Sequence, residues 1–493
     1  MKAKLLSKSN YLNGLQCLKY LWTIFHEPLK VPEPGEATQY VFDQGHLVGK
    51  LARQLYPGGI DLPEDNFKEN LRQTERLLVE HDKPLFEAGI LSDNLYARID
   101  ILRPAHGKDW DIIEIKSTTS VKDVHHQDLA FQRLCLERHG LSIDKCFLIH
   151  INNHYVKHGN ISPKYLFVIE DVTPAAEAAS LGIEERVDKM LAVIAGRSCP
   201  DIVIGKHCTE PYECPLSDCW AELPEHNIFS LYRGGQKCYE LYERGILSIA
   251  QIPDNLTMTL SQQIQKKCIV SNEVYVDTKG LRQFLSSLIY PLYFLDFETV
   301  SPAIPVFDNS RPYQAIPFQF SLHRVSSKDA VPEHCLFLAR YPEDPRPELL
   351  SKLGNSLGTH GSIIVYNKSF EKSVLKELAD AFPEHQDWIA DAISRIVDLL
   401  VPFRKFQYYH PAQNGSTSIK QVLPAITGLS YDALEIANGQ DASIAFQAVT
   451  YADADDETKN RVYEQLEQYC GLDTEGMLHI VNRLGDLLNE SHH

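Results

Sequence analysis

The sequence predicts an α/β protein of several domains, and three observations lead to this fold class. The chain has 493 residues, which corresponds to about three domains of ordinary size. It is 44% hydrophobic and 23% charged, a composition typical of globular proteins that build large cores. Apolar runs with strand periodicity alternate with amphipathic runs of helical periodicity, which is typical of mixed α/β domains.

Composition and charge exclude several classes of protein. No apolar run of the sequence approaches the roughly 20 residues that a membrane-spanning helix needs, and the first residues lack the apolar core of a secretory signal. We therefore expect a cytoplasmic protein with no membrane partner and no structural disulfides. The formal net charge of −18 argues against a protein that coats nucleic acid by general attraction, but it is compatible with acidic metal sites.

The patterns divide the chain into three parts, with seams near residues 200–225 and 285–290. Residues 1–222 mix helices and strands, residues 223–288 are predicted to be helical, and residues 289–493 form a second α/β domain. In the first part we expect, in order, helices at 11–25 and 44–55, strands at 95–104 and 109–118, a helix at 124–140 and a strand at 145–153. The last part should begin with a strand at 290–300 and end in a long helix at 456–488.

Two predicted strands of the first domain carry a candidate metal site. Asp100 ends one apparent strand, and Glu114 and Lys116 lie two residues apart in the next, so that these two face the same side of a sheet. An antiparallel pairing would bring Asp100 beside them. Two carboxylates can hold a hard divalent cation, and a lysine can position or deprotonate an attacking water. The alternative is a surface hairpin that carries an ion pair.

These residues resemble the PD-(D/E)xK nucleases, in particular the RecB-type branch that includes the CRISPR-associated iron–sulfur exonucleases. The resemblance covers residues 5–220 and implies a PD-(D/E)xK nuclease core, with a divalent metal held by Asp100 and Glu114 and with Lys116 in a catalytic role. It also implies a glutamine in the helix that follows, which "DLAFQRLCLE" supplies as Gln132.

The sequence departs from this family at two positions. The family often places a metal-binding histidine in a G-x-x-V-H helix, but "GHLVGKLA" has Gly49 there, which leaves His46 as the nearby candidate ligand. The glutamine motif usually continues to a tyrosine four residues later, where this chain has Leu136.

A cysteine-rich segment, "HCTEPYECPLSDCW", ends the first domain. Three cysteines lie within it: Cys208, Cys214 and Cys219. Three thiolates make an incomplete site, because structural zinc takes four ligands and cubane clusters are usually held by four cysteines. Cys199 and His207 are local candidates for the fourth ligand.

The RecB-type resemblance points instead to Cys17 as the fourth ligand, in "LSKSNYLNGLQCLKYLW". A ligand from each end of the domain would let the metal close a very long loop. We favour a structural 4Fe–4S cluster, with Zn²⁺ as the alternative because the Cys-x5-Cys-x4-Cys spacing departs from the usual Cys-x-x-Cys pair. A loop of unliganded cysteines is the remaining interpretation.

The last domain carries a second set of acidic residues. "YFLDFET" places Asp296 and Glu298 two residues apart on one face of an apolar strand, where a metal would compensate the buried charges. "YCGLDTEGM" places Tyr469 and Asp473 four residues apart on one face of a helix. The alternative is an incidental pattern of surface residues.

This set resembles the DnaQ-like (DEDD) 3′–5′ exonucleases of ribonuclease H-like fold, over residues 290–490. The Tyr-x-x-x-Asp spacing matches their tyrosine subtype, since the histidine subtype would need histidine where this chain has Gln468. The family's middle motif is met by "NKSFE", with Glu371 in place of the usual aspartate. Asp398 lies where the family often has a further aspartate.

The chemistry expected of this site is metal-assisted phosphodiester hydrolysis. Two Mg²⁺ or Mn²⁺ ions roughly 4 Å apart would activate the water and stabilise the leaving oxygen. The expected ligands are Asp296, Glu298, Glu371 and Asp473. Tyr469 would orient the water, because an ordinary tyrosine pKa of about 10 makes it a poor base at neutral pH.

The sequence as a whole therefore predicts two nuclease domains that act on DNA or RNA, single-stranded in preference. Between them, "ELYERGILSIAQIP" is similar to the helix–hairpin–helix modules that grip nucleic-acid backbones. One alternative keeps only the C-terminal site active and retains the first domain for binding. Another is a nucleic-acid-binding or regulatory scaffold in which one or both sites are degenerate.

Overall fold

The computed structural model describes residues 4–490, and over this range the protein is mixed α/β, with strands gathered in several sheets. The α/β class expected from the sequence is thus confirmed at this level. The chain divides into two compact units: unit 1 is Met1–Glu222 with Pro302–Tyr313, and unit 2 is Leu223–Ser301 with Gln314–His493. None of the described helices is long and apolar enough to cross a membrane.

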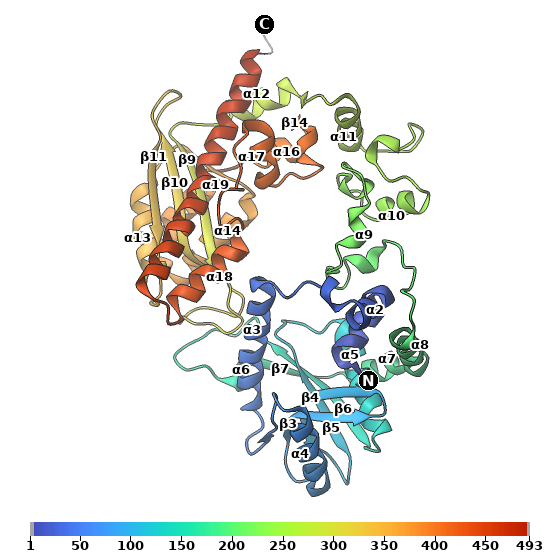
Figure 1. Ribbon diagram of the computed structural model, residues 1–493. Coiled ribbons are helices and arrows are strands. Elements are labelled where there is room, and N and C mark those ends of the chain that lie inside the picture. The colour runs from blue at the N-terminus through green and yellow to red at the C-terminus, as the bar shows by residue number, and fades with distance from the viewer. Residues whose placement is uncertain (1–3, 491–493) are drawn as a thin grey trace. The chain divides into compact units, whose positions relative to one another are not determined.

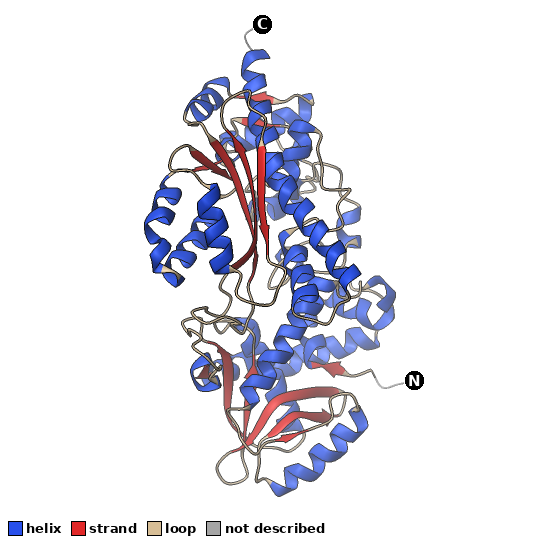
Figure 2. Cartoon of the chain, turned by 90° about the vertical axis from the view of Figure 1, so that its left-hand side faces the viewer, coloured by secondary structure: helices blue, strands red, loops and turns tan. Residues whose placement is uncertain are grey.

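Unit 1 is built on a seven-stranded sheet with the order β2-β3-β4-β5-β6-β7, in which β1 also pairs with β4 (Figure 2). β3, β4 and β5 are antiparallel neighbours, whereas β5 and β6 run parallel. The strands are β1 (Leu6–Ser7), β2 (Ile60–Asp61), β3 (Leu85–Ser92), β4 (Leu95–Pro104), β5 (Trp110–Ile115), β6 (Ile143–Ile151) and β7 (Phe167–Asp171).

The long strand β4 pairs with two strands in succession. Its start pairs with β1, through Leu6 opposite Leu95, and its end pairs with β5, through Ile101 opposite Ile113. The two-residue strand β1 therefore brings the start of the next helix close to the middle of β4, where Asp100 lies. No periodicity can be read from two residues, so the sequence does not reveal this pairing.

Helices cover both faces of this sheet. Ile112 belongs to the core formed with the helix at 123–138, and its neighbour Ile113 belongs to the core formed with the helix at 36–53, because successive strand residues face opposite sides. The helices are α1 (Lys8–Gln16), α2 (Leu18–His26), α3 (Glu36–Arg53), α4 (Phe67–Glu80), α5 (Asp123–Arg138), α6 (Pro163–Leu166), α7 (Thr173–Ser180), α8 (Ile183–Ala195) and α9 (Asp218–Ala221), with 3-10 turns η1 (Pro28–Lys30) and η2 (Lys206–Cys208).

The helix expected at 11–25 is two helices in the structure. Cys17 ends α1 and begins α2 with extended backbone angles, φ −157° and ψ 120°. This prediction was wrong because the amphipathic pattern continues across the break and no proline or glycine marks it. The break turns the chain at the cysteine that the family resemblance singled out.

Unit 2 contains a five-stranded sheet with the order β11-β10-β9-β12-β13 and helices on both faces (Figure 2). β9 is the middle strand; it runs antiparallel to β10 and parallel to β12. The strands of unit 2 are β8 (Tyr275–Val276), β9 (Leu292–Val300), β10 (Ile316–Val325), β11 (Glu333–Leu338), β12 (Ser362–Val365), β13 (Ile396–Asp398) and β14 (Tyr408–Tyr409).

The long helix α19 packs against β9 and β10 (red in Figure 1). Residues 223–288, predicted to be helical, also contain β8, which pairs with β14. The helices of unit 2 are η3 (Ile228–Ser230), α10 (Gln236–Glu243), η4 (Ile249–Gln251), α11 (Leu260–Ser271), α12 (Thr278–Ser286), α13 (Arg346–Ser356), α14 (Lys368–Ala381), η5 (Pro383–His385), α15 (Gln386–Ser394), α16 (Val401–Arg404), η6 (Pro411–Gln413), α17 (Ile419–Thr427), α18 (Gly439–Thr450) and α19 (Asp456–Glu490).

Candidate functional sites

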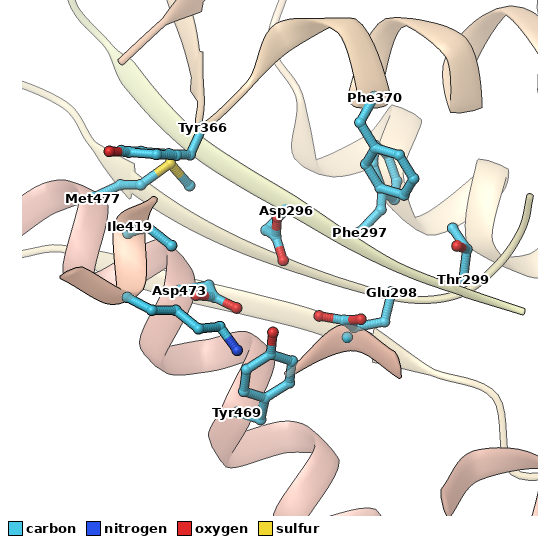
Figure 3. A pocket seen from close by; sticks show the side chains of 12 residues that line it. Asp296, Phe297, Glu298, Thr299, Tyr366, Phe370, Ile419, Tyr469, Asp473 and Met477 are labelled. Carbon is cyan, nitrogen blue, oxygen red and sulfur yellow. The ribbon is translucent and has the colours of Figure 1, made fainter. Parts of the chain in front are cut away.

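A pocket of about 360 Å³ lies in unit 2, between the middle strand β9 and helices α17 and α19. In Figure 3 the carboxylates of Asp296, Glu298 and Asp473 and the hydroxyl of Tyr469 point into the same space. The pocket is lined by Asp296, Phe297, Glu298, Thr299, Tyr366, Phe370, Ile419, Lys420, Gly439, Tyr469, Asp473 and Met477. Four of the five residues predicted for this site are therefore gathered here.

Strand and helix geometry explain this convergence. Asp296 and Glu298 share the face of β9 that α19 covers, and Tyr469 and Asp473 lie one helical turn apart on the facing side of α19. The apolar residues between them are buried: Phe297 on β9 is 2% exposed and Cys470 on α19 is fully buried.

The three carboxylates of this pocket repel one another in a poorly solvated space. Burial, followed by the charges of Asp473 and Glu298, holds the pKa of Asp296 well above its usual range. Burial and the charge of Asp473 raise the pKa of Glu298 in the same way. Burial raises the pKa of Asp473 to about 6. A divalent cation would relieve both the burial cost and the repulsion.

Two residues that the sequence analysis did not find belong to the site: Lys420 lines the pocket, and Tyr431 contacts one of its carboxylates. Tyr431 donates a hydrogen bond of 2.5 Å to Oδ1 of Asp473. Lys420 places its ammonium 4.8 Å from the ring centre of Tyr469 and 5.2 Å from that of Tyr431. Burial lowers the pKa of Lys420, although the charge of Asp473 opposes this shift. Neither residue belongs to a local motif, so no sequence signal could have found them.

Glu371 lies close to this site without lining it. It is 1% exposed in the first turn of α14, and its Oε2 accepts no hydrogen bond within the described part of the chain. Burial, with the charge of Asp398 adding to it, raises its pKa to about 8. Asp398 accepts hydrogen bonds from the backbone N–H groups of Asn367 and Leu400, so it fixes the junction between β12 and α14.

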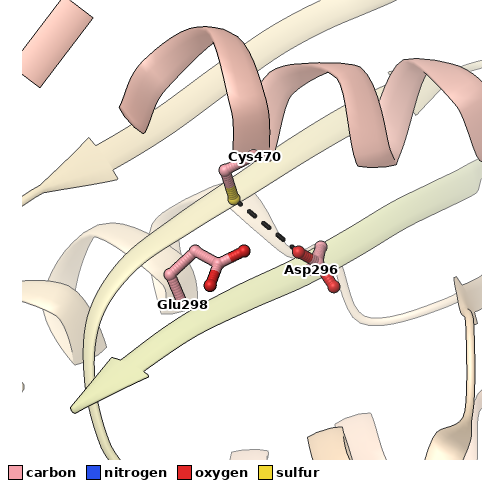
Figure 4. Close-up of side chains that lie close together, drawn as sticks. All are labelled: Asp296, Glu298 and Cys470. Atoms are coloured by element: carbon pink, nitrogen blue, oxygen red, sulfur yellow. Dashed lines mark hydrogen bonds between the residues drawn. The ribbon is translucent and has the colours of Figure 1, made fainter. Parts of the chain in front are cut away.

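A thiol joins the carboxylates at the centre of the site. The ligand atoms of Asp296, Glu298 and Cys470 all lie within 4.8 Å of one another, and among the described residues this is the one group of three or more such side chains with that spacing. Cys470 donates from Sγ to Oδ2 of Asp296 over 3.8 Å (Figure 4). Glu371 and Asp473, both expected as ligands, stand outside this group.

The predicted site of unit 1 is also assembled. Lys116 donates to Oε1 of Glu114 over 2.7 Å, and Gln132 donates to Oε2 of the same carboxylate over 2.7 Å. Asp100 accepts from the backbone N–H of Ile115 on the neighbouring strand β5. The register of β4 and β5 and the packing of α5 against the sheet thus bring all four predicted residues together.

Two further residues, Lys8 and Asp128, join the predicted residues into a closed network of hydrogen bonds and ion pairs. Lys8, the first residue of α1, donates to both carboxylate oxygens of Glu114 at 2.9 and 3.1 Å. Asp128 on α5 accepts from Lys116 at 2.7 Å and from Gln132 at 2.9 Å. Asp128 lies one turn before Gln132, so helical spacing could have found it, whereas Lys8 arrives only through the pairing of β1 with β4.

Two ammonium groups, those of Lys8 and Lys116, partly neutralise the three carboxylates of this network. Burial opposes ionisation of Glu114, but Lys116 and Lys8 outweigh it and lower its pKa. Burial and the charge of Glu114 raise the pKa of Asp100 to about 7. His46, expected as a ligand, is exposed on α3 and makes no hydrogen bond or ion pair with the described members of the network.

The structure brings Cys17 to the cysteine-rich segment. Gln16 donates to the carbonyl oxygens of His207 at 2.9 Å and Tyr212 at 2.6 Å, which ties the end of α1 to this segment. The thiols are close enough to affect one another, because the charges of Cys17 and Cys219 help to raise the pKa of Cys208 after burial itself. All four are free thiols: Cys17, Cys208, Cys214 and Cys219.

The spacing of these sulfur atoms bears on the metal they could hold. No three of them lie within 4.8 Å of one another in the described structure. Tetrahedral zinc with Zn–S bonds of about 2.3 Å requires sulfurs only about 3.8 Å apart. A cubane cluster binds each thiolate to a different iron, so its cysteine sulfurs lie farther apart than those of a zinc site. Cys199 is exposed, and its charge helps to raise the pKa of Lys19, which lies two residues after Cys17.

Comparison with known proteins gives similarities of limited extent. A family model described as a domain of unknown function, DUF2779, matches residues 293–418. This range includes Asp296, Glu298 and Glu371 and ends before Lys420 and α19. No solved structure matches the chain.

Three curated relatives are similar to parts of the chain. The uncharacterized protein UU173 of Ureaplasma parvum is 28% identical over 255 residues, which cover 45% of this chain and 36% of the relative. The uncharacterized protein MG366 of Mycoplasma genitalium is 26% identical over 219 residues, covering 40% and 32%. Its homolog in Mycoplasma pneumoniae is 30% identical over 206 residues, covering 38% and 31%. The chain thus spans about a third of the length of each of these relatives.

Proposed function

We propose that unit 2 is a divalent-metal-dependent 3′–5′ exonuclease of the DEDD class with a ribonuclease H-like fold. The observation that carries this proposal is the meeting of Asp296 and Glu298 with Tyr469 and Asp473 in one pocket. The strand order supports the fold: counted along the chain from β9, the sheet reads 3-2-1-4-5, with its second strand antiparallel to the rest. This order is compatible with the fold that the resemblance implies.

The side chains of the pocket have different roles in the proposed hydrolysis. Asp296, Glu298 and Asp473 would hold divalent ions, which supply an activated water and stabilise the leaving 3′ oxygen. Tyr469 positions the water through its hydroxyl, because burial keeps its pKa far above neutrality and prevents it from acting as a base. The ammonium of Lys420 offers positive charge to a phosphate at the pocket.

In this scheme Tyr431 contacts a metal ligand and not the metal itself. Its hydroxyl holds Asp473 in place, so it acts as a positioning residue. The substrate we propose is a single strand of DNA or RNA with a free 3′ end. Phe370, which is 38% exposed at the pocket, provides a ring on which a terminal base can stack.

For unit 1 we propose a PD-(D/E)xK core whose role is to bind nucleic acid, with a second nuclease activity as the alternative. The closed network favours binding, because Lys8 donates to both oxygens of Glu114 and so competes with a divalent ion for this carboxylate. Displacement of Lys8 by substrate would be required for the alternative.

We further propose that Cys17, Cys208, Cys214 and Cys219 hold a 4Fe–4S cluster, with zinc as the alternative. The resemblance to the iron–sulfur exonucleases supports the cluster, and Gln16 links the end of α1 to the segment that carries the other three cysteines. Its role is structural, because a cluster shared by Cys17 and the segment 208–219 connects the two ends of unit 1.

The test is a digestion panel of end-labelled single- and double-stranded DNA and RNA, with and without Mn²⁺ or Mg²⁺. We expect wild-type protein to release 3′ nucleotides from single strands, and Asp296→Ala to lose this activity while it remains folded. Asp329→Asn, at an exposed position of unit 2, is the matched control. Equal rates for Asp296→Ala and wild type would refute the proposal.

A second comparison separates the roles of the two units. Cleavage that survives in Asp296→Ala and disappears on the further change Lys116→Ala would establish a nuclease in unit 1. Loss of all cleavage in Asp296→Ala alone would support the binding role.

A further inference from the structure

Cys470 occupies an unusual position for a cysteine. It follows Tyr469 in α19, its side chain is fully buried, and its thiol points toward Asp296 on β9. Its Sγ lies 3.8 Å from Oδ2 of Asp296, and both atoms lie within 4.8 Å of a ligand atom of Glu298. A tetrahedral ion with metal–oxygen bonds of about 2.0 Å and a metal–sulfur bond of about 2.3 Å needs its ligand atoms about 3.3 to 3.5 Å apart. The three side chains therefore have nearly the spacing that such an ion requires.

Glu298 provides an independent indication that a cation belongs here. It is 6% exposed, and no hydrogen bond or ion pair of the described residues reaches its carboxylate. The carboxylate points into the pocket (Figure 3). A buried carboxylate without hydrogen bonds is costly, and a bound cation would remove that cost.

The chemistry of the three ligands selects among cations. Mg²⁺ prefers six oxygen ligands and binds thiolates weakly. Cobalt and zinc accept mixed oxygen and sulfur ligands, and their affinity for such sites exceeds that of manganese. The pocket beside the three ligands leaves an open coordination position for water or a phosphate oxygen, as catalytic sites require.

We propose that Cys470 is a metal ligand, together with Asp296 and Glu298, and that this site binds thiophilic divalent cations of the zinc and cobalt type in preference to Mg²⁺. The thiol releases its proton to solvent as the metal binds. The inference rests on the proposed function in that the same pocket serves hydrolysis, and it adds a sulfur ligand to the carboxylates that the sequence predicts.

The test uses the full-length protein with its cysteine cluster loaded and measures Co²⁺ binding in the absence of nucleic acid. Wild type should develop a sulfur-to-cobalt charge-transfer band in the near ultraviolet as Co²⁺ is added. Cys470→Ser should lose this band and bind Co²⁺ about 10- to 100-fold more weakly, with its Mg²⁺ affinity changed less than twofold. Cys335→Ser, at a half-buried thiol on β11, is the matched control and should keep the band.

Two outcomes would overturn the inference: a band of unchanged intensity in Cys470→Ser, or equal Co²⁺ affinities for wild type and variant. Cys470→Ala is measured beside it, and the near-ultraviolet circular dichroism of both variants identifies any loss of folding. Exonuclease assays separate this inference from the proposed function. Mg²⁺-dependent release of 3′ nucleotides without a cobalt band would leave the exonuclease and remove the sulfur ligand. A cobalt band in a protein that digests no substrate would support the sulfur ligand and contradict the exonuclease.

Discussion

The hydroxyl of Tyr431 lies 2.5 Å from Oδ1 of Asp473 and joins the loop before α18 to the helix α19. This contact spans 42 residues of sequence and is buried. Together with burial and the charge of Lys420, it determines how readily Asp473 ionises. The position of one carboxylate in the pocket thus depends on a loop that contains no recognisable motif.

Tyr431→Phe should lower kcat for 3′ nucleotide release by about 10-fold and leave KM unchanged, because it removes only the hydrogen bond that orients Asp473. Steady-state kinetics on a labelled single strand measure both constants. Tyr341→Phe, at a tyrosine that is 73% exposed, is the control and should behave as wild type. A rise in KM with unchanged kcat would show that Tyr431 contacts substrate instead of positioning Asp473.

Lys8→Met should destabilise unit 1 by about 3 kcal/mol, because Glu114 and Asp128 stay buried with one cation fewer. It should also create a cation site, so Mg²⁺ should raise the thermal midpoint of the variant and leave that of wild type unchanged. Thermal unfolding with and without Mg²⁺ measures both effects, with Lys108→Met as the exposed control. An equal Mg²⁺ effect on wild type would show that Lys8 does not occupy the cation position.

Cys17→Ser should remove the cluster and destabilise unit 1, because the metal then no longer connects α1 to the segment that contains Cys208. Anaerobically purified wild type should be brown, with visible absorbance that bleaches on reduction, and the variant should be colourless. Cys199→Ser is the matched control and should keep its iron, since Cys199 is exposed. If the wild-type protein carries one zinc ion and no iron, the metal held by the cysteines is zinc and not an iron–sulfur cluster. Full metal content in Cys17→Ser would remove Cys17 as a ligand.

The stability of unit 2 should fall between about pH 6.5 and pH 4 because of His323. Burial, together with the stacked ring of His334 at 4.2 Å and His479, lowers the pKa of His323 to about 4. The unfolded chain binds a proton below about pH 6.5, whereas the folded chain resists it until about pH 4, so acid favours unfolding over this range. His323→Asn keeps a group that can bond Thr474 and should show a flatter pH dependence in urea denaturation. Parallel curves for variant and wild type would contradict this.

The periodicity of the sequence determined which side chains share a face. The spacing of two in β9 placed Asp296 and Glu298 together, and the spacing of four in α19 did the same for Tyr469 and Asp473. These relationships depend only on the geometry of a single element, which is why they could be predicted. The same holds for Glu114 and Lys116 in and directly after β5.

The tertiary structure alone decided which faces meet and what else enters the sites. Lys8 reaches Glu114 through a two-residue strand, Lys420 and Tyr431 come from loops and a helix without motifs, and Cys470 faces β9 from between two predicted site residues. Each of these contacts joins segments far apart in the chain. Local periodicity carries no information about such pairings, because they follow from how the sheets and helices pack as a whole.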